Sequence, residues 1–249
     1  MKKLLFLLLF LTLTSLHAGK ITVATAANVS YAMDDLIKAF NLLHPETKVQ
    51  VILGSSGKLT AQIMHGAPYD IFMSADMKYP ETLYEKKLAV TKPIIYAEGT
   101  LSMLSQKKRN YSTGFFLLKD SSIKKIAIAN PQTAPYGVAT KEALENAKLY
   151  NMIKGKLIYG ESISQTLSFS ISAADIGIIA TSALFSPRMK KYKKTIDWVE
   201  IDEELYTPIK QGIVILKEGE ESVEVKDFYN FMLSKKAKKI LSSFGYKVK

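Results

Sequence analysis

The sequence predicts an α/β protein with two domains, each built around a mostly parallel sheet. Strand-like and helix-like patterns alternate along nearly the whole chain, an order typical of parallel strands with helices packed on the sheet faces. The chain contains more of these units than one small sheet accommodates. Its 249 residues are 47% hydrophobic and 23% charged, the composition of a globular protein that buries a sizeable core.

The first part of the chain has a strand–helix–strand–helix–strand order. Met33, Leu36, Ile37 and Phe40 recur at the spacing of one helix face, and Pro45 ends this helix. A second, short helix follows the loop 54–57. The predicted strands are residues 20–26, 48–53 and 70–73.

The rest of the chain repeats the pattern and closes with a helix whose apolar side contains Val223, Phe228, Phe231 and Met232. No segment rich in Pro, Gly or Ser links two domains. We therefore expect short crossovers near residues 96–99 and 206–210, where extended segments adjoin a Gly or a Pro. Further helices are predicted at about residues 138–149 and 162–171. The further predicted strands are residues 101–104, 125–129, 157–159, 175–180 and 212–216.

The first 18 residues have the three regions of a secretory signal peptide. Lys2 and Lys3 form the basic start, residues 4–13 form the apolar core, and Ala18 is the small residue at the expected cleavage site. The apolar run is too short to span a membrane comfortably. The chain has no cysteine, which excludes disulfides, thiolate metal sites and a cysteine nucleophile. We expect a soluble protein exported to the periplasm and cleaved near Ala18.

The charge of the chain is strongly basic, with a formal net charge of +11. Such a charge would fit a nucleic-acid-binding protein. The lysine clusters at 107–109, 190–194 and 235–239 are separate from one another, however, which indicates solvent-exposed surface. Together with export, this pattern disfavours a nucleic-acid binder. The summed field of the lysines still favours the approach of anions.

The sequence shows no motif of the common enzyme classes. Gly57-Lys58 lacks the spacing of a phosphate-binding loop, because Ile52 stands where the first glycine is needed. After residue 18 only His44 and His65 remain, and neither belongs to a metal-binding motif. An exported enzyme would have to rely on carboxylates such as Asp70 and Asp76, which equally fit a capping role.

Four loops share a pattern that suits anion binding. In each, a strand runs into small or polar residues that open a helix, whose first N–H groups are unpaired and carry the positive end of the helix dipole. Asn, Ser and Tyr side chains add neutral donors. For any one loop, helix capping explains the same residues, so the four loops are suggestive only as a set. They are residues 26–28, 55–57, 135–137 and 162–164.

At these loops the sequence resembles the periplasmic molybdate/tungstate-binding proteins of ABC transporters, the ModA-like family. The resemblance extends from about Lys20 to Lys249 and is carried by the segments ITVATAANVSYAMDDLIKAF, GSSGKLTAQIMHGAPYDIFMSAD, NPQTAPYGVATKEAL, DIGIIATSAL and FGYKVK. It implies a two-lobed solute-binding fold of the class II type with a hinge of two crossover segments. Residues 19–97 plus 210–249 would form lobe I, and residues 98–209 would form lobe II.

The resemblance also implies a ligand site between the lobes, in which neutral groups hold molybdate or tungstate. Molybdenum or tungsten would be present only within the oxyanion, with no cofactor and no catalytic residue. Ser55 and Gly57 would flank the site. The implied contacts are Ala27, Asn28, Ser56, Tyr136 and the backbone N–H of Ile163.

The sequence departs from the commonest family pattern at three positions. Many members have Ser where Asn28 stands, a small residue where Tyr136 stands, and a ligand-contacting Tyr where Ala180 stands. Tyr136 is expected to supply the phenol from another loop, so that the number of donors is kept. Both molybdate and tungstate are expected to bind.

The resemblance implies a receptor that delivers its ligand to the permease of an inner-membrane ABC transporter, without enzymatic activity. We expect a monomer, because a receptor that docks through both lobes needs those surfaces free. Three alternatives remain at this point. The first is a receptor for another oxyanion, such as sulfate or thiosulfate. The second is an exported enzyme on the same fold, and the third is a structural or adhesive surface protein, which the lack of repeats and disulfides disfavours.

Overall fold

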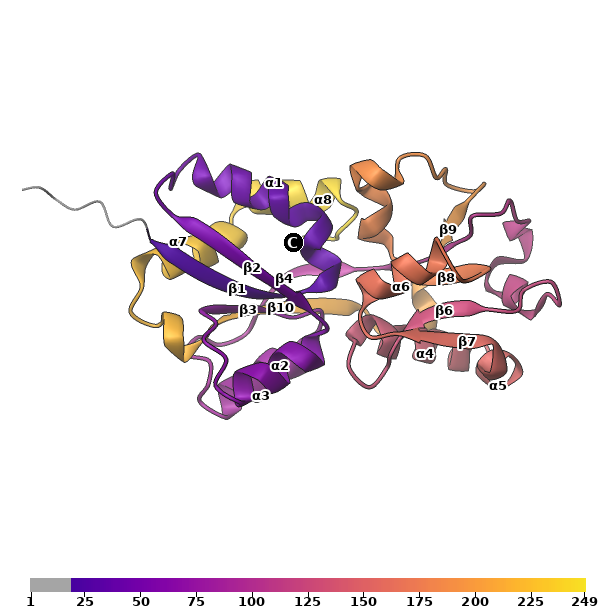
Figure 1. Cartoon of the computed structure of the whole chain (residues 1–249), viewed down its shortest axis with the longest axis horizontal. Helices are drawn as coiled ribbons and strands as arrows, with labels where there is room; N and C mark the ends of the chain where they lie inside the picture. The colour runs from indigo at the N-terminus through magenta and orange to yellow at the C-terminus, as the bar shows by residue number, and fades with distance from the viewer. Residues whose placement is uncertain (1–18) are drawn as a thin grey trace, which may run out of the picture.

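The computed structural model describes residues 19–249, and the predicted signal peptide lies outside them. The chain folds into two lobes that lie side by side, each with a five-stranded sheet (Figure 1). Within the described residues, no helix is both long and apolar enough to cross a membrane.

Lobe I contains the sheet with the strand order β2-β1-β3-β10-β4. β1 pairs in parallel with β2 and with β3, whereas β10 is antiparallel to both β3 and β4. The strands are β1 (Lys20–Ala26), β2 (Lys48–Gly54), β3 (Ile71–Met73), β4 (Ile94–Gly99) and β10 (Ile209–Ile215).

Helices cover both faces of this sheet because apolar side chains alternate along its strands. In β3, Ile71 and Met73 point to one face, where they pack with Phe40 of α1 and Phe228 of α7. Phe72 between them points to the other face. The helices on the first face are α1 (Ser30–Asn41), α7 (Val223–Met232) and α8 (Lys235–Ser243), and those on the second are α2 (Ser56–Met64) and α3 (Lys78–Glu85).

Lobe II repeats this design with the strand order β7-β6-β8-β5-β9. β6 is parallel to β7 and β8, and β5 is antiparallel to β8 and β9. The strands are β5 (Leu101–Leu104), β6 (Ile126–Ala129), β7 (Leu157–Gly160), β8 (Ile176–Ala180) and β9 (Trp198–Glu200). The helices are α4 (Pro135–Asn146), α5 (Tyr150–Ile153) and α6 (Ile163–Ser170).

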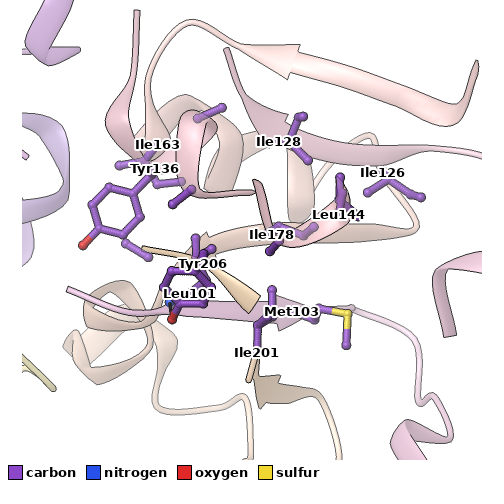
Figure 2. Close-up of a cluster of buried hydrophobic side chains, with 14 of the residues drawn as sticks. Leu101, Met103, Ile126, Ile128, Tyr136, Leu144, Ile163, Ile178, Ile201 and Tyr206 are labelled. Carbon is purple, nitrogen blue, oxygen red and sulfur yellow. Dashed lines mark hydrogen bonds between the residues drawn. The ribbon is translucent and has the colours of Figure 1, made fainter. Parts of the chain in front are cut away.

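The core of lobe II forms between the sheet and α4. Ile126, Ile128 and Ile178 of the strands pack with Leu144 of α4, as Figure 2 shows. The same cluster continues into lobe I through Ala26, Ala27 and Ala75. The lobes therefore share buried apolar surface.

The chain crosses between the lobes in two places. It leaves lobe I at the end of β4 and enters β5 after the single residue Thr100, and it returns from β9 to β10. The return passes through the short 3-10 helix η6 (Glu203–Leu205). The other 3-10 helices are η1 (Ala27–Val29), η2 (Tyr111–Lys119), η3 (Lys154–Lys156), η4 (Thr181–Phe185), η5 (Pro187–Met189) and η7 (Lys217–Gly219).

Both sheets are mixed, which the strand–helix alternation alone does not predict. The reversed strands, β10 and β5, are those that follow the crossovers, so they enter their sheets from the opposite direction. The predicted order of strands and helices is otherwise present. The sequence reasoning missed α3, α5, α8 and β9, and it took β4 for an extended segment only. The first crossover follows β4 directly, close to the predicted residues 96–99.

Candidate functional site

A small cavity lies where the two lobes meet. Its volume is about 190 Å³ including its mouth. Lobe I contributes the ends of β1 and β2 and the segment after β3, and lobe II contributes the first residues of α4 and α6. The lining residues are Ala26, Ala27, Asn28, Gly54, Ser55, Ser56, Ala75, Ala134, Pro135, Tyr136 and Ile163.

The cavity is surrounded by helix N-termini. α2 begins at Ser56, α4 at Pro135 and α6 at Ile163. The N-cap residues of α2 and α4, Ser55 and Ala134, accept no side-chain cap hydrogen bond, whereas Ser162 caps α6 by accepting from the backbone N–H of Gln165 at 3.3 Å. Pro135 has no backbone N–H, and that of Gly57 donates to the carbonyl of Thr133. The backbone N–H groups of Ser56 and Tyr136 find no partner among the described residues. These partial positive charges favour an anion.

Ser56 presents a hydroxyl whose oxygen is already engaged. Its Oγ accepts a hydrogen bond from the backbone N–H of Ala75 at 3.0 Å, and Ser56 is fully buried. None of residues 19–249 accepts the hydroxyl hydrogen in return. Since a hydroxyl has one hydrogen to donate, Ser56 can donate it into the cavity.

Tyr136 repeats this arrangement from the other lobe. Its hydroxyl oxygen accepts a hydrogen bond from Nε2 of Gln211 at 3.1 Å, and no acceptor for its hydrogen is found in the described part of the chain. Figure 2 shows the ring at the margin of the lobe II core, with the hydroxyl directed away from the aliphatic side chains. Burial raises the pKa of the Tyr136 phenol well above 10, so the phenol keeps its hydrogen.

Asn28 lines the cavity, but its side chain is not the neutral donor that the sequence suggested. Both hydrogens of its amide are committed, because Nδ2 donates to Oε1 of Gln211 at 2.8 Å and to the hydroxyl of Tyr246 at 2.9 Å. The side chain does not cap a helix either, since the N-cap of α1 is Val29 and shows no side-chain cap bond. What Asn28 can offer an anion is its backbone N–H.

The remaining predicted site residues fall into two groups. Ala27 and Ile163 line the cavity as the first residues of η1 and α6, and Ser55 lines it as well. Gly57 does not line it; its backbone N–H donates to the carbonyl of Thr133 in lobe II at 2.9 Å. Ala180 also stays outside, buried in the lobe II core.

The lining contains no Lys, Arg, His, Asp or Glu. Two charged side chains, Glu161 and Lys58, lie outside the lining. Oε1 of Glu161 accepts from Ser55 Oγ at 3.3 Å, and Lys58 Nζ lies 3.7 Å from the same oxygen. Both of these charged side chains are about half exposed. An anion in the cavity would meet dipoles and hydroxyl groups only.

The lobes are closed on one another around the cavity. Ser164 of α6 donates through Oγ to the carbonyl of Ala27 at 2.9 Å, and Ser182 donates to the carbonyl of Asn28 at 3.3 Å. With the bond from Gly57 to Thr133, these contacts join loops of opposite lobes on several sides of the cavity. These contacts hold the lobes together beside the cavity.

The carboxylates considered for an enzyme do not form a pair at the cavity. Asp70 Oδ2 accepts from the backbone N–H of Thr22 at 2.6 Å, and Asp76 Oδ1 accepts from Ser74 Oγ at 2.9 Å. Burial raises the pKa of each carboxyl, but neither residue lines the cavity. Across residues 19–249, no three His, Asp or Glu side chains group in a way that could hold a metal ion.

Three polar residues behind the cavity were missed by the sequence reasoning. Gln211, Tyr96 and Tyr246 are buried and hydrogen-bonded to one another or to Asn28. A signal was present in the sequence, because Gln211 is a polar residue directly before a glycine and an apolar strand. The predicted strand began at 212, three residues after the start of β10, and so excluded it.

Residues 21–247 match the family described as bacterial extracellular solute-binding proteins. The chain is 32% identical to the molybdate-binding proteins ModA of Rhodobacter capsulatus and Azotobacter vinelandii, over 92% of this chain and 88% and 90% of theirs. The solved structure of the periplasmic molybdate-binding protein of A. vinelandii superposes with a TM-score of 0.84 at 31% identity, over 92% of this chain and 99% of that one. The chain therefore belongs to the ModA-like family of bacterial extracellular solute-binding proteins, which serve ABC transport and are not enzymes.

Proposed function

We propose that the protein binds molybdate or tungstate in the cavity between its lobes and delivers it to the permease of an inner-membrane ABC transporter. The observation that carries this proposal is a lining without charged side chains in which two hydroxyl groups are free to donate. Ser56 and Tyr136 each use the hydroxyl oxygen to accept a bond from the protein, which leaves the hydrogen for the ligand. Similarity to molybdate-binding proteins in sequence and in structure supports the choice of ion.

The proposed contacts come from both lobes. Lobe I contributes the backbone N–H groups of Ala27 and Asn28 and the hydroxyl of Ser56. Lobe II contributes the hydroxyl of Tyr136 and the backbone N–H of Ile163. A tetrahedral dianion, with acceptor oxygens in four directions, suits donors arranged around it on opposite walls.

Neutral donors hold a dianion effectively because the closed lobes exclude water. Hydrogen bonds to a charged group are stronger than those between neutral groups, and their electrostatic part grows as the local dielectric constant falls. Hinge closure of this kind is common in periplasmic receptors. The closed form is proposed to be the one that docks on the transporter.

Selectivity is proposed to follow from size and protonation. Sulfate is smaller than molybdate and would leave some donors too far away for good hydrogen bonds. A protonated phosphate carries a hydroxyl hydrogen, and the lining offers no carboxylate to accept it. Molybdate and tungstate are nearly equal in size and charge, so both are expected to bind.

Thermal unfolding of the chain from residue 19 onward tests the proposal. The protein is first refolded to remove any bound anion, and then heated with molybdate, tungstate, sulfate, thiosulfate or phosphate. Ligand at about a hundredfold excess over Kd adds roughly 2.7 kcal/mol, which raises the Tm by about 5–10 °C for a chain of this size. A shift with sulfate or thiosulfate alone would reassign the ligand, and the absence of a shift with every anion would overturn the proposal.

Binding is expected to be independent of pH across the neutral range. Tyr136 is the only lining side chain that titrates, and its raised pKa keeps it neutral below about pH 10. Because the neutral phenol is the donor, the affinity should fall only as the pH rises through that pKa. Calorimetric titrations with molybdate at about pH 6.5, 7.5 and 8.5 should give the same Kd. A steep change between them would indicate a charged group in the site.

A further inference from the structure

We propose that Gln211 is a positioning residue that makes Tyr136 a hydrogen-bond donor to the ligand when the lobes close. This inference rests on the proposed oxyanion-binding function and extends it to a residue outside the cavity lining. Gln211 is fully buried in β10.

The local backbone places the Gln211 side chain between the lobes. The pairing of β10 with β4 shifts register between Gln211 and Gly212, and irregularities of this kind re-aim a side chain in a strand. On the facing strand, Gly99 leaves space for the Tyr136 hydroxyl, which a Cβ at this position would overlap. The amide of Gln211 thereby reaches a phenol of the opposite lobe.

The hydrogen bonds at the other end of the Gln211 amide fix its orientation. Oε1 accepts from the hydroxyl of Tyr96 at 2.8 Å and from Nδ2 of Asn28 at 2.8 Å. An amide has one end that accepts and one that donates. Because Asn28 Nδ2 can only donate, the Gln211 atom that faces it is Oε1, and Nε2 faces Tyr136. The hydroxyl oxygen of Tyr136 therefore accepts, and its hydrogen is left for the cavity.

Tyr246 fixes the orientation of Asn28 in turn. Its hydroxyl accepts from Nδ2 of Asn28 at 2.9 Å and donates to the Asn28 carbonyl at 2.8 Å. Oδ1 of Asn28 finds no partner among the described residues. If the side-chain amides of Asn28 and Gln211 were both flipped, Oε1 of Gln211 would face Tyr136. The Tyr136 hydroxyl would then donate its hydrogen bond to Gln211 and would have none left for the ligand. The Tyr246 hydroxyl holds the network in the first arrangement, because its own hydrogen is donated to the Asn28 carbonyl and it can only accept from the Asn28 amide.

The bond from Gln211 to Tyr136 also joins the lobes, since β10 belongs to lobe I and α4 to lobe II. It forms only when the lobes are together. The Tyr136 donor is therefore oriented by the same movement that encloses the ligand.

Gln211→Glu tests this inference because it keeps the shape of the side chain but replaces the Nε2 donor by an oxygen. An ionised carboxylate would accept the Tyr136 hydrogen, and molybdate affinity should fall by about tenfold or more. Burial raises the pKa of such a carboxyl towards neutrality. At lower pH the protonated carboxyl donates in place of Nε2, so the affinity of this variant should recover as the pH falls, whereas the wild type stays constant.

A double-mutant cycle separates positioning from a general structural effect. Gln211→Met is used in the cycle, because it removes the donor without placing a negative charge near the anion. In the Tyr136→Phe background, where no hydroxyl is left to orient, Gln211→Met should change Kd by less than about threefold. Gln62→Glu is the matched control, because Gln62 also pairs with a tyrosine hydroxyl in lobe I, that of Tyr69 at 3.1 Å, but does not line the cavity. Gln211→Glu is kept out of the cycle, because its ionised carboxylate would repel the anion in both backgrounds.

The outcomes distinguish this inference from the proposed function. Independent, multiplying losses from the two substitutions, or an unchanged affinity of the Gln211 variants, would overturn the role of Gln211 and leave the receptor intact. Failure of the wild-type protein to bind any tetrahedral oxyanion would overturn the proposed function, and the inference with it.

Discussion

Replacing Tyr136 with Phe is expected to weaken molybdate binding by about 10- to 100-fold, the worth of a hydrogen bond to a charged group. The substitution removes the hydroxyl and keeps the ring, which fills the margin of the lobe II core. The fold should be retained, although Nε2 of Gln211 loses its acceptor. Isothermal titration calorimetry measures the affinity, and thermal unfolding without ligand measures the stability.

Tyr206→Phe is the matched control for this variant. Tyr206 belongs to the same buried cluster, and its hydroxyl accepts from the backbone N–H of Leu101 at 3.1 Å. It does not line the cavity, so its removal should cost about 1 kcal/mol of stability and leave the affinity unchanged. Equal losses of affinity in both variants would contradict a direct contact between Tyr136 and the anion.

Gly57→Ala is expected to hold the lobes apart and to lower the affinity by about tenfold or more. A Cβ at this position would lie 2.9 Å from the carbonyl oxygen of Thr133 and 3.2 Å from its Cα. Both atoms belong to the backbone of the opposite lobe and cannot turn away. The added Cβ would also lie 2.7 Å from the Tyr79 hydroxyl of the same lobe, which is the end of a side chain and can turn away. Since the clash with Thr133 exists only when the lobes are closed, the open protein should lose little stability.

Small-angle X-ray scattering and calorimetry together test this expectation. The wild type should become more compact when molybdate is added, and the Gly57→Ala variant should do so less or not at all. Gly155→Ala is the control, because a Cβ at Gly155 meets no atom within 4 Å. A variant at Gly57 that binds and closes like the wild type would show that the contact with Thr133 is dispensable.

The elements with strong periodicity could be predicted from the sequence. α1 was found because Met33, Leu36 and Phe40 recur at the spacing of one helix face, and all three are buried. α8 was missed because four lysines in its nine residues hide a narrow apolar side formed by Ala237 and Leu241. The antiparallel course of β10 depends on the crossover geometry between lobes, which local patterns do not encode.

The loops that form the candidate site could be predicted from the sequence, but the hydrogen bonds within the site could not. The four strand-to-helix loops do meet at one cavity, and the five expected contact residues all line it. That they touch the ligand remains a prediction. The commitment of the Asn28 amide to Gln211 and Tyr246 could not be foreseen, because these residues lie 183 and 218 positions away in sequence.

The crystal structure of the molybdate complex, with anomalous scattering data for molybdenum, tests the central claim most directly. We expect one molybdenum peak in the interlobe cavity, within hydrogen-bond reach of Ser56 Oγ and the Tyr136 hydroxyl, and no lysine or arginine touching the anion. A peak outside the cavity, or an anion held by lysine or arginine side chains, would contradict binding by neutral donors.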